Sequence, residues 1–452
     1  MTVLLISILV LLELGFMVFE LTRSEAKKEW TTKRIILNAA QLVVFFLMVL
    51  LPGIDTSFRF MGLIIMLVLR IVVSGIFWLT NRKNAKTKKK AAIVLGGLFG
   101  AMLIATSTFP AFLFTDYEGR PVTGPYTVAQ CNCILVDKSR IETFENDGSN
   151  REVPVYFFAP AEAKDGEKFP LVVFSHGAFG YYQSNASSYL ELASNGYVVV
   201  SIEHPYHSFF TKDTEGKTVT VDSDFISSCM NANGDMTEEK IYEVSRSWME
   251  LRVADMNFAL DSLIAGADSG DLDGYWFEND VSKESVTRML SHIDTDKIGL
   301  MGHSMGGATA VEVGKIRDDI DCVIDIDGTM LSNIKGVKDG KYIVDETPYR
   351  VPLLEFENEN SHWELQEMAK TDYPYPNITI KDTAETYFCT YVEGTLHMDY
   401  TDLPLFSPFL AKMLGSGNVD HGYVSDTVNS LEVRFFDCYL KGEGIFDVNE
   451  HY

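Results

Sequence analysis

The sequence predicts an α/β fold, a mostly parallel β-sheet with helices on both faces, preceded by about four transmembrane helices. Within residues 116–452, short β-branched apolar runs alternate with helical patterns. Continuous apolar strands separated by helices are typical of a parallel sheet that is covered on both sides. Within residues 1–115, four apolar runs each have roughly the 20 residues that a helix needs to cross a bilayer.

The charge of the chain divides at the same place. The 452 residues carry a formal net charge of −25. Residues 1–115 hold 13 Lys and Arg against 5 Asp and Glu, whereas residues 116–452 hold 25 against 58. The hydrophobic content and the acidic excess exclude a disordered tail protein, a short disulfide scaffold and a basic nucleic-acid-binding protein. We therefore predict two domains, a membrane domain over residues 1–115 and an acidic domain over 116–452, with no nucleic acid as partner.

The loops between the apolar runs predict the membrane topology. The runs are Thr2–Leu21, Ile35–Leu51, Phe60–Leu79 and Ala91–Phe114. They are apolar nearly all round, whereas the helices of a soluble bundle would show polar faces. Basic residues crowd the first and third loops, 22–34 and 80–90, which the positive-inside rule places in the cytoplasm. We expect a multi-pass protein of the cell membrane whose residues 116–452 lie on the extracytoplasmic side.

Polar and small residues inside these runs predict helix contacts within the bilayer. Glu13 and Arg70 lie in two different runs, and we expect them to pair inside the bundle. Gly96 and Gly100 have the spacing of small residues that lets two helices pack closely.

The acidic part contains seven predicted strands and four predicted helices. The strands are Val153–Phe158, Pro170–Ser175, Tyr197–Ile202, Lys297–Met301, Cys322–Ile326, Val351–Phe356 and Thr386–Val392. The helices are Ser187–Ser194, Thr237–Ile264, Gly307–Ile316 and Val424–Leu440. Because chemistry gathers at the carboxyl ends of the strands in such sheets, the residues that follow each strand are the functional candidates.

A candidate nucleophile follows the predicted strand Lys297–Met301. Residues 302–306 read Gly-His-Ser-Met-Gly and lead into a helix. The G-x-S-x-G pattern places a serine on a tight, strained strand-to-helix turn that exposes its hydroxyl. Ser304 is therefore the candidate nucleophile, and the following helix N-terminus offers N–H groups to a developing oxyanion.

The catalytic base and acid are expected after the serine, in the order Ser, acid, His. The histidines that follow Ser304 are His362, His397, His421 and His451. His397 is the candidate base, because it follows the last predicted strand after a short Gly-Thr turn. Asp327 is the candidate acid, because it ends the strand next after the nucleophile. Glu355 and Glu357, at the end of the following strand, are the other candidates for the acid.

An oxyanion hole of two backbone amides completes such a site. Met305, the residue after the nucleophile, provides the first amide. The loop Phe174–Gly180 follows an earlier strand and contains the glycines that allow its amides to turn toward a carbonyl oxygen. Ala178 is the predicted second donor, with Phe179 as the alternative. The aromatic pair 209–210 and the aromatic run 275–277 are candidates to face an acyl chain.

At these residues the chain resembles the platelet-activating-factor acetylhydrolase family of α/β-hydrolases. The matching segments are Phe174–Gly177, Ile202–His204, Gly302–Gly307, the strand end at Asp327 and Gly394–His397, within about residues 120–440. The resemblance implies the α/β-hydrolase fold, the triad Ser304, Asp327 and His397, and no metal or cofactor. It implies hydrolysis of ester bonds, with short or oxidised acyl chains on glycerophospholipids as the typical substrate.

Several functions share this set of residues. The expected partners are an ester or lipid substrate and the membrane bilayer. The Gly-His-Ser-Met-Gly-Gly segment is also similar to that of cutinase-like polyester hydrolases, which leaves a general carboxylesterase as an alternative. A peptidase or an acyltransferase is possible on the same triad, and a membrane scaffold with an inactive hydrolase domain is the non-enzymatic alternative.

Residues 269–280 partly imitate a calcium-binding loop. Ser269 stands where the first acidic ligand is expected, so we predict a solvated acidic loop and no metal. All six cysteines lie in the acidic part, and their spacing contains no CxxC pair of the kind that binds zinc. Their disulfide pairing and the oligomeric state remain open.

Overall fold

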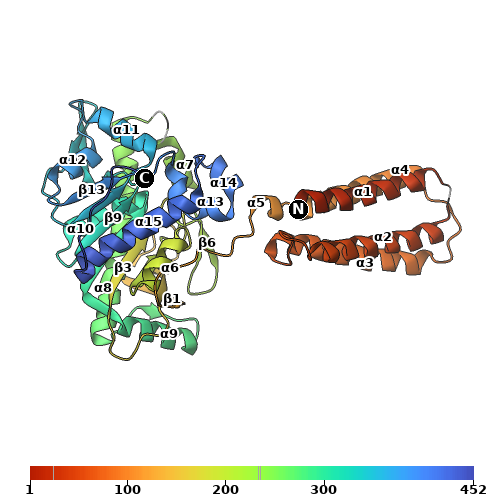
Figure 1. The fold of residues 1–452 in the computed structure, drawn as a ribbon, viewed down its shortest axis with the longest axis horizontal. Helices are drawn as coiled ribbons and strands as arrows, with labels where there is room; N and C mark the ends of the chain where they lie inside the picture. Colours follow the sequence, from red (N-terminus) through yellow and green to blue (C-terminus); the bar gives the residue numbers. More distant parts are fainter. Residues whose placement is uncertain (24, 233, 235) are drawn as a thin grey trace. The chain divides into compact units, whose positions relative to one another are not determined.

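The chain divides into two compact units. The computed structural model describes residues 1–452 except 24, 233 and 235. One unit comprises Met1–Glu118 with Leu405–Leu410, and the other comprises Gly119–Pro404 with Ala411–Tyr452. Figure 1 draws the helices of the first unit in red and orange and the α/β unit mainly in yellow to blue.

Four helices of the first unit are long and apolar enough to cross a membrane. They are α1 (Thr2–Leu21), α2 (Lys27–Met48), α3 (Phe58–Asn81) and α4 (Lys90–Ser107). Helix α2 begins at Lys27 rather than at Ile35, because the basic residues before the apolar run are good helix formers. Helix α4 ends at Ser107, and Pro110 opens the short helix α5 (Pro110–Leu113), where a residue without an N–H fits the first helical position.

The predicted ion pair inside the bundle is present and has a third member. The fully buried Glu13 lies with one oxygen 2.5 Å from Arg70 Nη2 and the other 2.6 Å from Arg34 Nη2. Gly100 makes room for the Glu13 carboxylate, since a Cβ there would collide with it. The prediction of Gly96 as the second small contact residue is wrong. Gly96 has open space around it, and the neighbouring Gly97 packs against Met17 instead.

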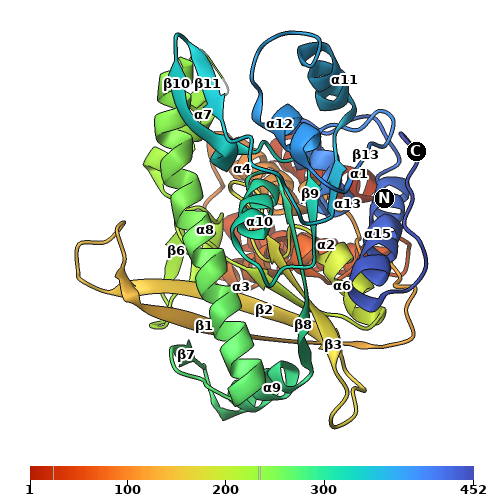
Figure 2. The same ribbon diagram turned by 90° about the vertical axis from the view of Figure 1, so that its left-hand side faces the viewer.

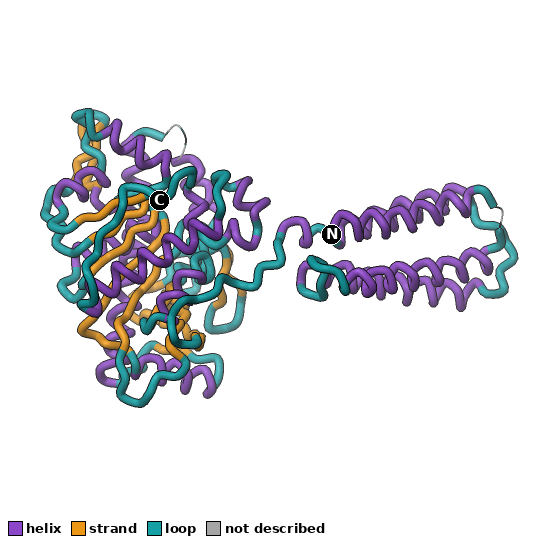
Figure 3. Tube along the Cα trace, in the orientation of Figure 1, coloured by secondary structure: helices purple, strands orange, loops and turns teal. Residues whose placement is uncertain are grey.

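The α/β unit is built on one sheet, to which nine of the described strands belong. Their order is β13-β12-β9-β8-β3-β4-β2-β1-β7. The strands are β1 (Val128–Ile141), β2 (Asn150–Pro160), β3 (Phe169–Ser175), β4 (Val198–Ile202), β7 (Tyr275–Trp276), β8 (Ile293–His303), β9 (Cys322–Ile326), β12 (Leu353–Phe356) and β13 (Tyr387–Thr390). The strands from β13 to β4 pair in parallel, whereas β2, β1 and β7 join antiparallel. The mostly parallel sheet is confirmed by these pairings, and Figure 3 shows its strands in orange among the purple helices.

Helices cover both faces of the sheet. They are α6 (Ala186–Ser194), α7 (Ser223–Ala232), α8 (Glu238–Ser269), α9 (Asp280–Ser291), α10 (Met305–Ile316), α11 (Glu359–Met368), α12 (Pro376–Thr383), α13 (Leu403–Phe406), α14 (Pro408–Met413) and α15 (His421–Phe436), with short turns η1 (Leu331–Asn333), η2 (His397–Tyr400) and η3 (Asp437–Lys441). Helices α8, α9 and α10 pack on one core, and α6 and α15 pack on the other. Figure 2 shows α8 and α10 crossing one face of the sheet.

Strand β3 shows why both faces are buried. Leu171 and Val173 point into the core under α8 and α10, whereas Val172 and Phe174 point into the core under α6 and α15. Successive side chains of a strand alternate between faces, so an uninterrupted apolar run serves two cores at once. The parallel pairing of neighbouring strands brings the carboxyl ends of β3, β8, β9 and β12 to one edge of the sheet.

Three features of the α/β unit were not expected from the pattern. Strand β1 carries a mixed Cys-Asn-Cys and Asp-Lys sequence because one of its faces is partly exposed. Tyr275 and Trp276 form the edge strand β7 against β1, within the segment predicted as a solvated acidic loop. Two hairpins, β5 (Phe210–Lys212) with β6 (Thr218–Thr220) and β10 (Ile334–Lys338) with β11 (Lys341–Val344), lie outside the main sheet. All six cysteines are unpaired.

Candidate active site

Ser304 occupies a strained turn between β8 and α10. Its φ of 57° and ψ of −125° lie in a region that non-glycine residues rarely adopt. The turn is held because the Ser304 amide donates to the carbonyl oxygen of Ile326 at 2.7 Å. Gly306 allows it, because a Cβ there would overlap the Ser175 carbonyl oxygen of β3. The side chain is only partly buried, so its hydroxyl is available at the edge of the sheet.

The turn after β9 and the loop after β13 bring Asp327 and His397 together. Asp327 follows β9 with a φ of 55°, and its Oδ2 lies 2.5 Å from His397 Nδ1. The amide and side-chain NH₂ of Asn358 donate to the same carboxylate, at 2.8 to 3.0 Å. The imidazole of His397 is 43% exposed, whereas the Asp327 side chain is 4% exposed. One ring nitrogen of His397 is thus fixed by a buried carboxylate while the ring remains accessible.

His303, the residue before Ser304, contacts His397. The ring of His303 lies 4.6 Å from the ring of His397 between centroids, and its Nε2 is 3.2 Å from the His397 carbonyl oxygen. The structure thus brings the His397 loop against the nucleophile turn. Within the described part of the chain, the Ser304 hydroxyl forms no hydrogen bond to His397, a link that often tightens only when substrate is bound.

The other candidates for base and acid are engaged elsewhere. His362 pairs with Glu357 at 2.5 Å, and His421 Nδ1 lies 3.1 Å from Asp399. Glu355 accepts hydrogen bonds from Asn377 at 2.9 Å and from the Tyr387 hydroxyl. Of the carboxylates considered from the sequence, Asp327 is the one that His397 contacts.

The environment sets the charges of the pair. Burial opposes ionisation of Asp327, but the hydrogen bonds from His397 and Asn358 outweigh it and lower the pKa of the carboxyl. Partial burial disfavours protonation of His397, but the hydrogen bond and negative charge of Asp327 outweigh it and raise the pKa of the imidazole. The neighbouring His303 has its pKa lowered to about 3 by burial and by His397, so that ring is neutral.

Asp325, one step deeper in β9, is a buried acid beneath the nucleophile turn. It is fully buried and accepts a hydrogen bond from the Gly328 amide at 3.1 Å. Burial and the nearby Glu355 raise its pKa well above the usual range, which favours the neutral form. Gly307 leaves it room, since a Cβ there would overlap the Asp325 carboxyl. Asp325 supports the turn from below and does not contact His397.

The loop after β3 approaches Ser304 as an oxyanion hole requires. A Cβ on Gly177 would lie 3.2 Å from the Ser304 Cβ, so the loop backbone runs directly beside the serine. The Phe179 amide donates to the His207 carbonyl oxygen at 3.1 Å and is therefore occupied. Among the described residues the Ala178 amide has no acceptor, and the Met305 amide belongs to the first turn of α10, where helical N–H groups lack partners. Ala178 and Met305 thus remain the two free donors, and Phe179 does not.

An apolar cluster lies against these two amides. Met305 and Ala178 pack with Phe225 and Cys229 of α7 and Trp248 of α8. A cavity of about 640 Å³ borders the same Phe225 and Trp248 from the side of Arg151 and Glu142, and Ser304 does not line it. Phe225 therefore lies between the candidate oxyanion residues and an open volume.

The two aromatic candidates for acyl contact have different positions. Phe209 and Phe210 are 58% and 42% exposed, and the Phe209 amide donates to the Gly180 carbonyl oxygen of the oxyanion loop. Tyr275, in contrast, lies on β7, at the opposite edge of the sheet from β13. Its hydroxyl donates to the Ser262 carbonyl oxygen of α8. The pair 209–210 is near the candidate site, and the segment 275–277 is not.

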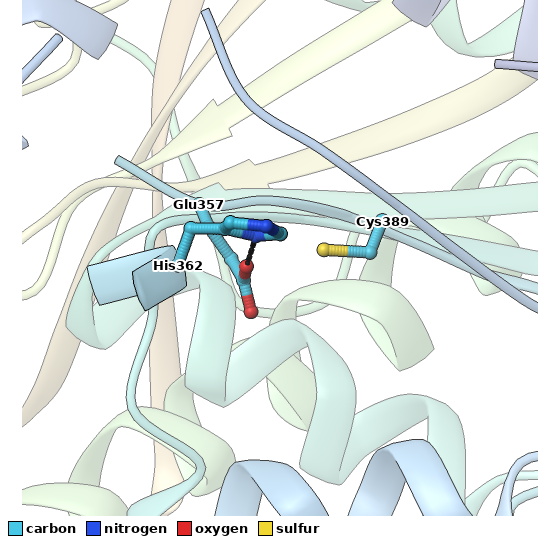
Figure 4. A group of neighbouring side chains, drawn as sticks. All are labelled: Glu357, His362 and Cys389. Atoms are coloured by element: carbon cyan, nitrogen blue, oxygen red, sulfur yellow. Dashed lines mark hydrogen bonds and ion pairs between the residues drawn. The ribbon is translucent and has the colours of Figure 1, made fainter. Parts of the chain in front are cut away.

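One group of side chains near the site has the donor atoms of a metal centre. Glu357, His362 and Cys389 bring a carboxylate oxygen, a ring nitrogen and a sulfur within 4.8 Å of one another (Figure 4). This oxygen, nitrogen and sulfur set is one that zinc accepts. Here, however, His362 Nδ1 already lies 2.5 Å from Glu357, and His362 Nε2 is 2.8 Å from Gln366. Both ring nitrogens of His362 are therefore already engaged in hydrogen bonds.

The comparisons with known proteins follow the same geometry. A family model described as platelet-activating factor acetylhydrolase, isoform II, matches residues 136–448, which include β2 to α15 and every candidate residue. The chain belongs to this family.

Relatives of this chain are found among vertebrate proteins. The platelet-activating factor acetylhydrolase of Gallus gallus is 26% identical over 64% of this chain and 66% of its own length. The protein of the same name from Bos taurus is 24% identical over 64% of this chain and 61% of its own length. The chain thus spans about three-fifths to two-thirds of the relatives it matches.

A solved structure supports the fold. A ferulic acid esterase from Streptomyces cinnamoneus superposes with a TM-score of 0.51 at 20% identity, covering 72% of this chain and 93% of its own. The α/β-hydrolase fold predicted from the sequence is therefore confirmed for this member of the platelet-activating factor acetylhydrolase family.

Proposed function

We propose that this protein is a membrane-anchored serine hydrolase that cleaves carboxylic esters through Ser304, His397 and Asp327. The observation that carries the proposal is the buried Asp327 carboxylate 2.5 Å from His397 Nδ1, on a loop that packs against the turn presenting Ser304. A buried acid that orients an exposed imidazole beside a strained serine is the arrangement that activates a hydroxyl for acyl transfer.

The proposed reaction proceeds in two steps. The Ser304 oxygen attacks the ester carbonyl carbon while His397 Nε2 takes its proton, and the Asp327 carboxylate stabilises the resulting imidazolium. The amides of Ala178 and Met305 donate to the oxyanion, and His397 then gives the proton to the leaving alcohol. A water molecule then attacks the acyl-enzyme carbonyl carbon while His397 takes its proton, and His397 returns this proton to the Ser304 oxygen as the acid leaves.

Family membership supports a lipid ester as substrate. The vertebrate relatives are named platelet-activating factor acetylhydrolases, and we propose a phospholipid with a short acyl chain as the substrate of this protein. The apolar cluster of Met305, Phe225 and Trp248 beside the candidate oxyanion amides suits an acyl group of limited length. Four membrane-spanning helices would hold the site near such lipids.

A covalent probe tests the assignment of the nucleophile. The full chain, purified in detergent, is treated with a fluorophosphonate, which reacts with activated serines. We expect labelling of the wild type and of Ser332→Ala, a control in the half-buried turn η1, but none of Ser304→Ala. Turnover of acetyl esters should fall with labelling, by about 10⁴-fold or more. Wild-type protein without labelling, or equal labelling of Ser304→Ala, would overturn the proposal.

A further inference from the structure

A buried arginine lies behind the oxyanion loop. Arg252, on α8, is fully buried. Its Nη1 donates to the carbonyl oxygen of His176, and its Nη2 donates to that of Gly177 at 3.3 Å. Its Nε lies 3.4 Å from His207 Nδ1. The guanidinium group therefore donates mainly to two consecutive carbonyl oxygens of the loop that passes Ser304.

The geometry of the peptide bond carries this contact to the candidate oxyanion hole. In a trans peptide the C=O and the N–H of the next residue point in opposite directions. The Gly177 carbonyl oxygen accepts from Arg252, from His176 Nδ1 at 2.7 Å and from the Gly180 amide at 3.1 Å. The N–H on the far side of that peptide belongs to Ala178, so three donors on one side orient the amide away from the arginine.

Among the described residues no carboxylate forms a direct ion pair with Arg252, and its positive charge is offset only at longer range, by Asp255 and by the buried Glu203. The nearest acid on its helix, Asp255, is already bound by Arg151 at 2.7 Å, by Arg140 at 2.9 Å and by His204 at 3.0 Å. Burial lowers the pKa of Arg252 to about 9, partly offset by Cys229 and Asp255, so the group stays cationic at neutral pH.

We propose that Arg252 is a positioning residue for ester hydrolysis, which aims the Ala178 amide at the oxyanion and strengthens it by polarising the Gly177–Ala178 peptide. A fixed cation on the carbonyl side of a peptide makes its N–H a better donor toward a charge that develops on the other side. The buried cation, which has no direct carboxylate partner, then stabilises the negative charge that appears in the tetrahedral intermediate. This inference rests on the proposed function of Ser304.

The test compares two equally buried arginines in the full chain. Arg252→Met removes the charge and the carbonyl contacts, and Arg151→Met is the matched control, since Arg151 is 3% exposed and binds Asp255 rather than the oxyanion loop. We expect kcat of Arg252→Met to fall about 100-fold, the size of losing one oxyanion donor, with KM changed by less than about three-fold. Arg252→Lys, a point charge that reaches one carbonyl, should retain about a tenth of wild-type kcat.

Binding of a transition-state analogue separates positioning from mere stability. A trifluoromethyl ketone forms a tetrahedral adduct with the serine, whereas the product acid does not. We expect Arg252→Met to lose affinity for the ketone in proportion to kcat and to keep its affinity for the acid, with thermal unfolding followed for every variant. If Arg252→Met does not fold, Arg252→Lys serves for the same comparison.

Three results would overturn the inference: a loss confined to KM, a loss no larger than that of Arg151→Met, or equal weakening of ketone and acid. These differ from failure of the proposed function, which would appear as undiminished turnover by Ser304→Ala.

Discussion

At the scale of single residues, the candidate site depends on how buried groups share charge. Asp327 is ionised in a buried position because His397 and Asn358 both donate to it, while Asp325 and Glu355 nearby have raised pKa values. Burial raises the pKa of Glu355 to about 8, with Glu357 adding to the effect. Among these three acids, Asp327 therefore carries the negative charge that stabilises a protonated His397.

The pH dependence of kcat/KM should report this pair. A general base works in its neutral form, and Asp327 raises the pKa of His397 above 6.5. Activity is therefore expected to rise with pH through a midpoint above 6.5. Asp327→Asn removes the raising charge, so the midpoint should move down, and kcat should fall by about 10⁴-fold.

Glu357→Gln is the matched control for this profile. Glu357 is another buried carboxylate at the same edge of the sheet, but it pairs with His362. The Glu357→Gln variant should show the same pH midpoint of kcat/KM as the wild type. A wild-type midpoint at or below 6.5, or the same displacement in both variants, would contradict the assignment.

The sequence predicts some of these residues and misses others for a physical reason. Ser304, Asp327 and His397 follow predicted strands, so chain order and a turn motif were enough to name them, and the structure brings Asp327 and His397 together. Asn358 and Arg252 act through contacts across elements. Arg252 left one trace in the sequence, as a charge within the apolar stripe that Trp248, Met249 and Met256 form on a helix.

At the scale of elements, α7 contributes Phe225 both to an apolar side-chain cluster and to the wall of a cavity. Phe225 of this helix packs in the cluster with Met305 and Ala178, stacks on His207 at 3.7 Å between ring centroids, and also lines the 640 Å³ cavity. In the proposed enzyme this ring would close the acyl side of the candidate site. Sequence patterns did not predict the helix α7 itself, because a ten-residue helix with one buried face has too little periodicity to stand out.

Phe225→Ala should therefore lengthen the accepted acyl chain. Removing the ring joins the cluster at Met305 to the cavity. If the opened space takes about two more CH₂ groups of the chain, at about 0.8 kcal/mol each, the ratio of kcat/KM for octanoyl to acetyl esters is expected to rise about tenfold. Met230→Ala is the control, because Met230 lies on the same helix and is 69% exposed. An unchanged ratio, or an equal rise with Met230→Ala, would contradict the role of Phe225 as the end of the acyl site.

At the scale of the whole molecule, the net charge of −25 belongs to two units with different tasks. The helical unit buries the ion cluster of Glu13 with Arg34 and Arg70, and many of its other basic residues lie in the first turns of α2 and in the loop before α4. The α/β unit is stabilised by two cores on the faces of one sheet, with its six cysteines unpaired. The fold class followed from patterns repeated over many residues, which is why it could be predicted more completely than the site.

The side of the membrane on which the α/β unit lies remains a proposal that reporter fusions can test. The basic segments 22–34, which includes the start of α2, and 80–90 favour the cytoplasm, which would place both ends of the helical unit outside. Alkaline phosphatase becomes active only after export, because its disulfides form in an oxidising compartment. Fused after Tyr452 in a bacterial host, it should be active, whereas a fusion after Lys90 should be inactive and a β-galactosidase fusion there active. Replacing the basic residues of 82–90 by glutamine should weaken this difference, because they set the orientation. Strong phosphatase activity after Lys90 with none after Tyr452 would reverse the topology and place Ser304 in the cytoplasm, where its lipid substrates would have to come from the inner leaflet.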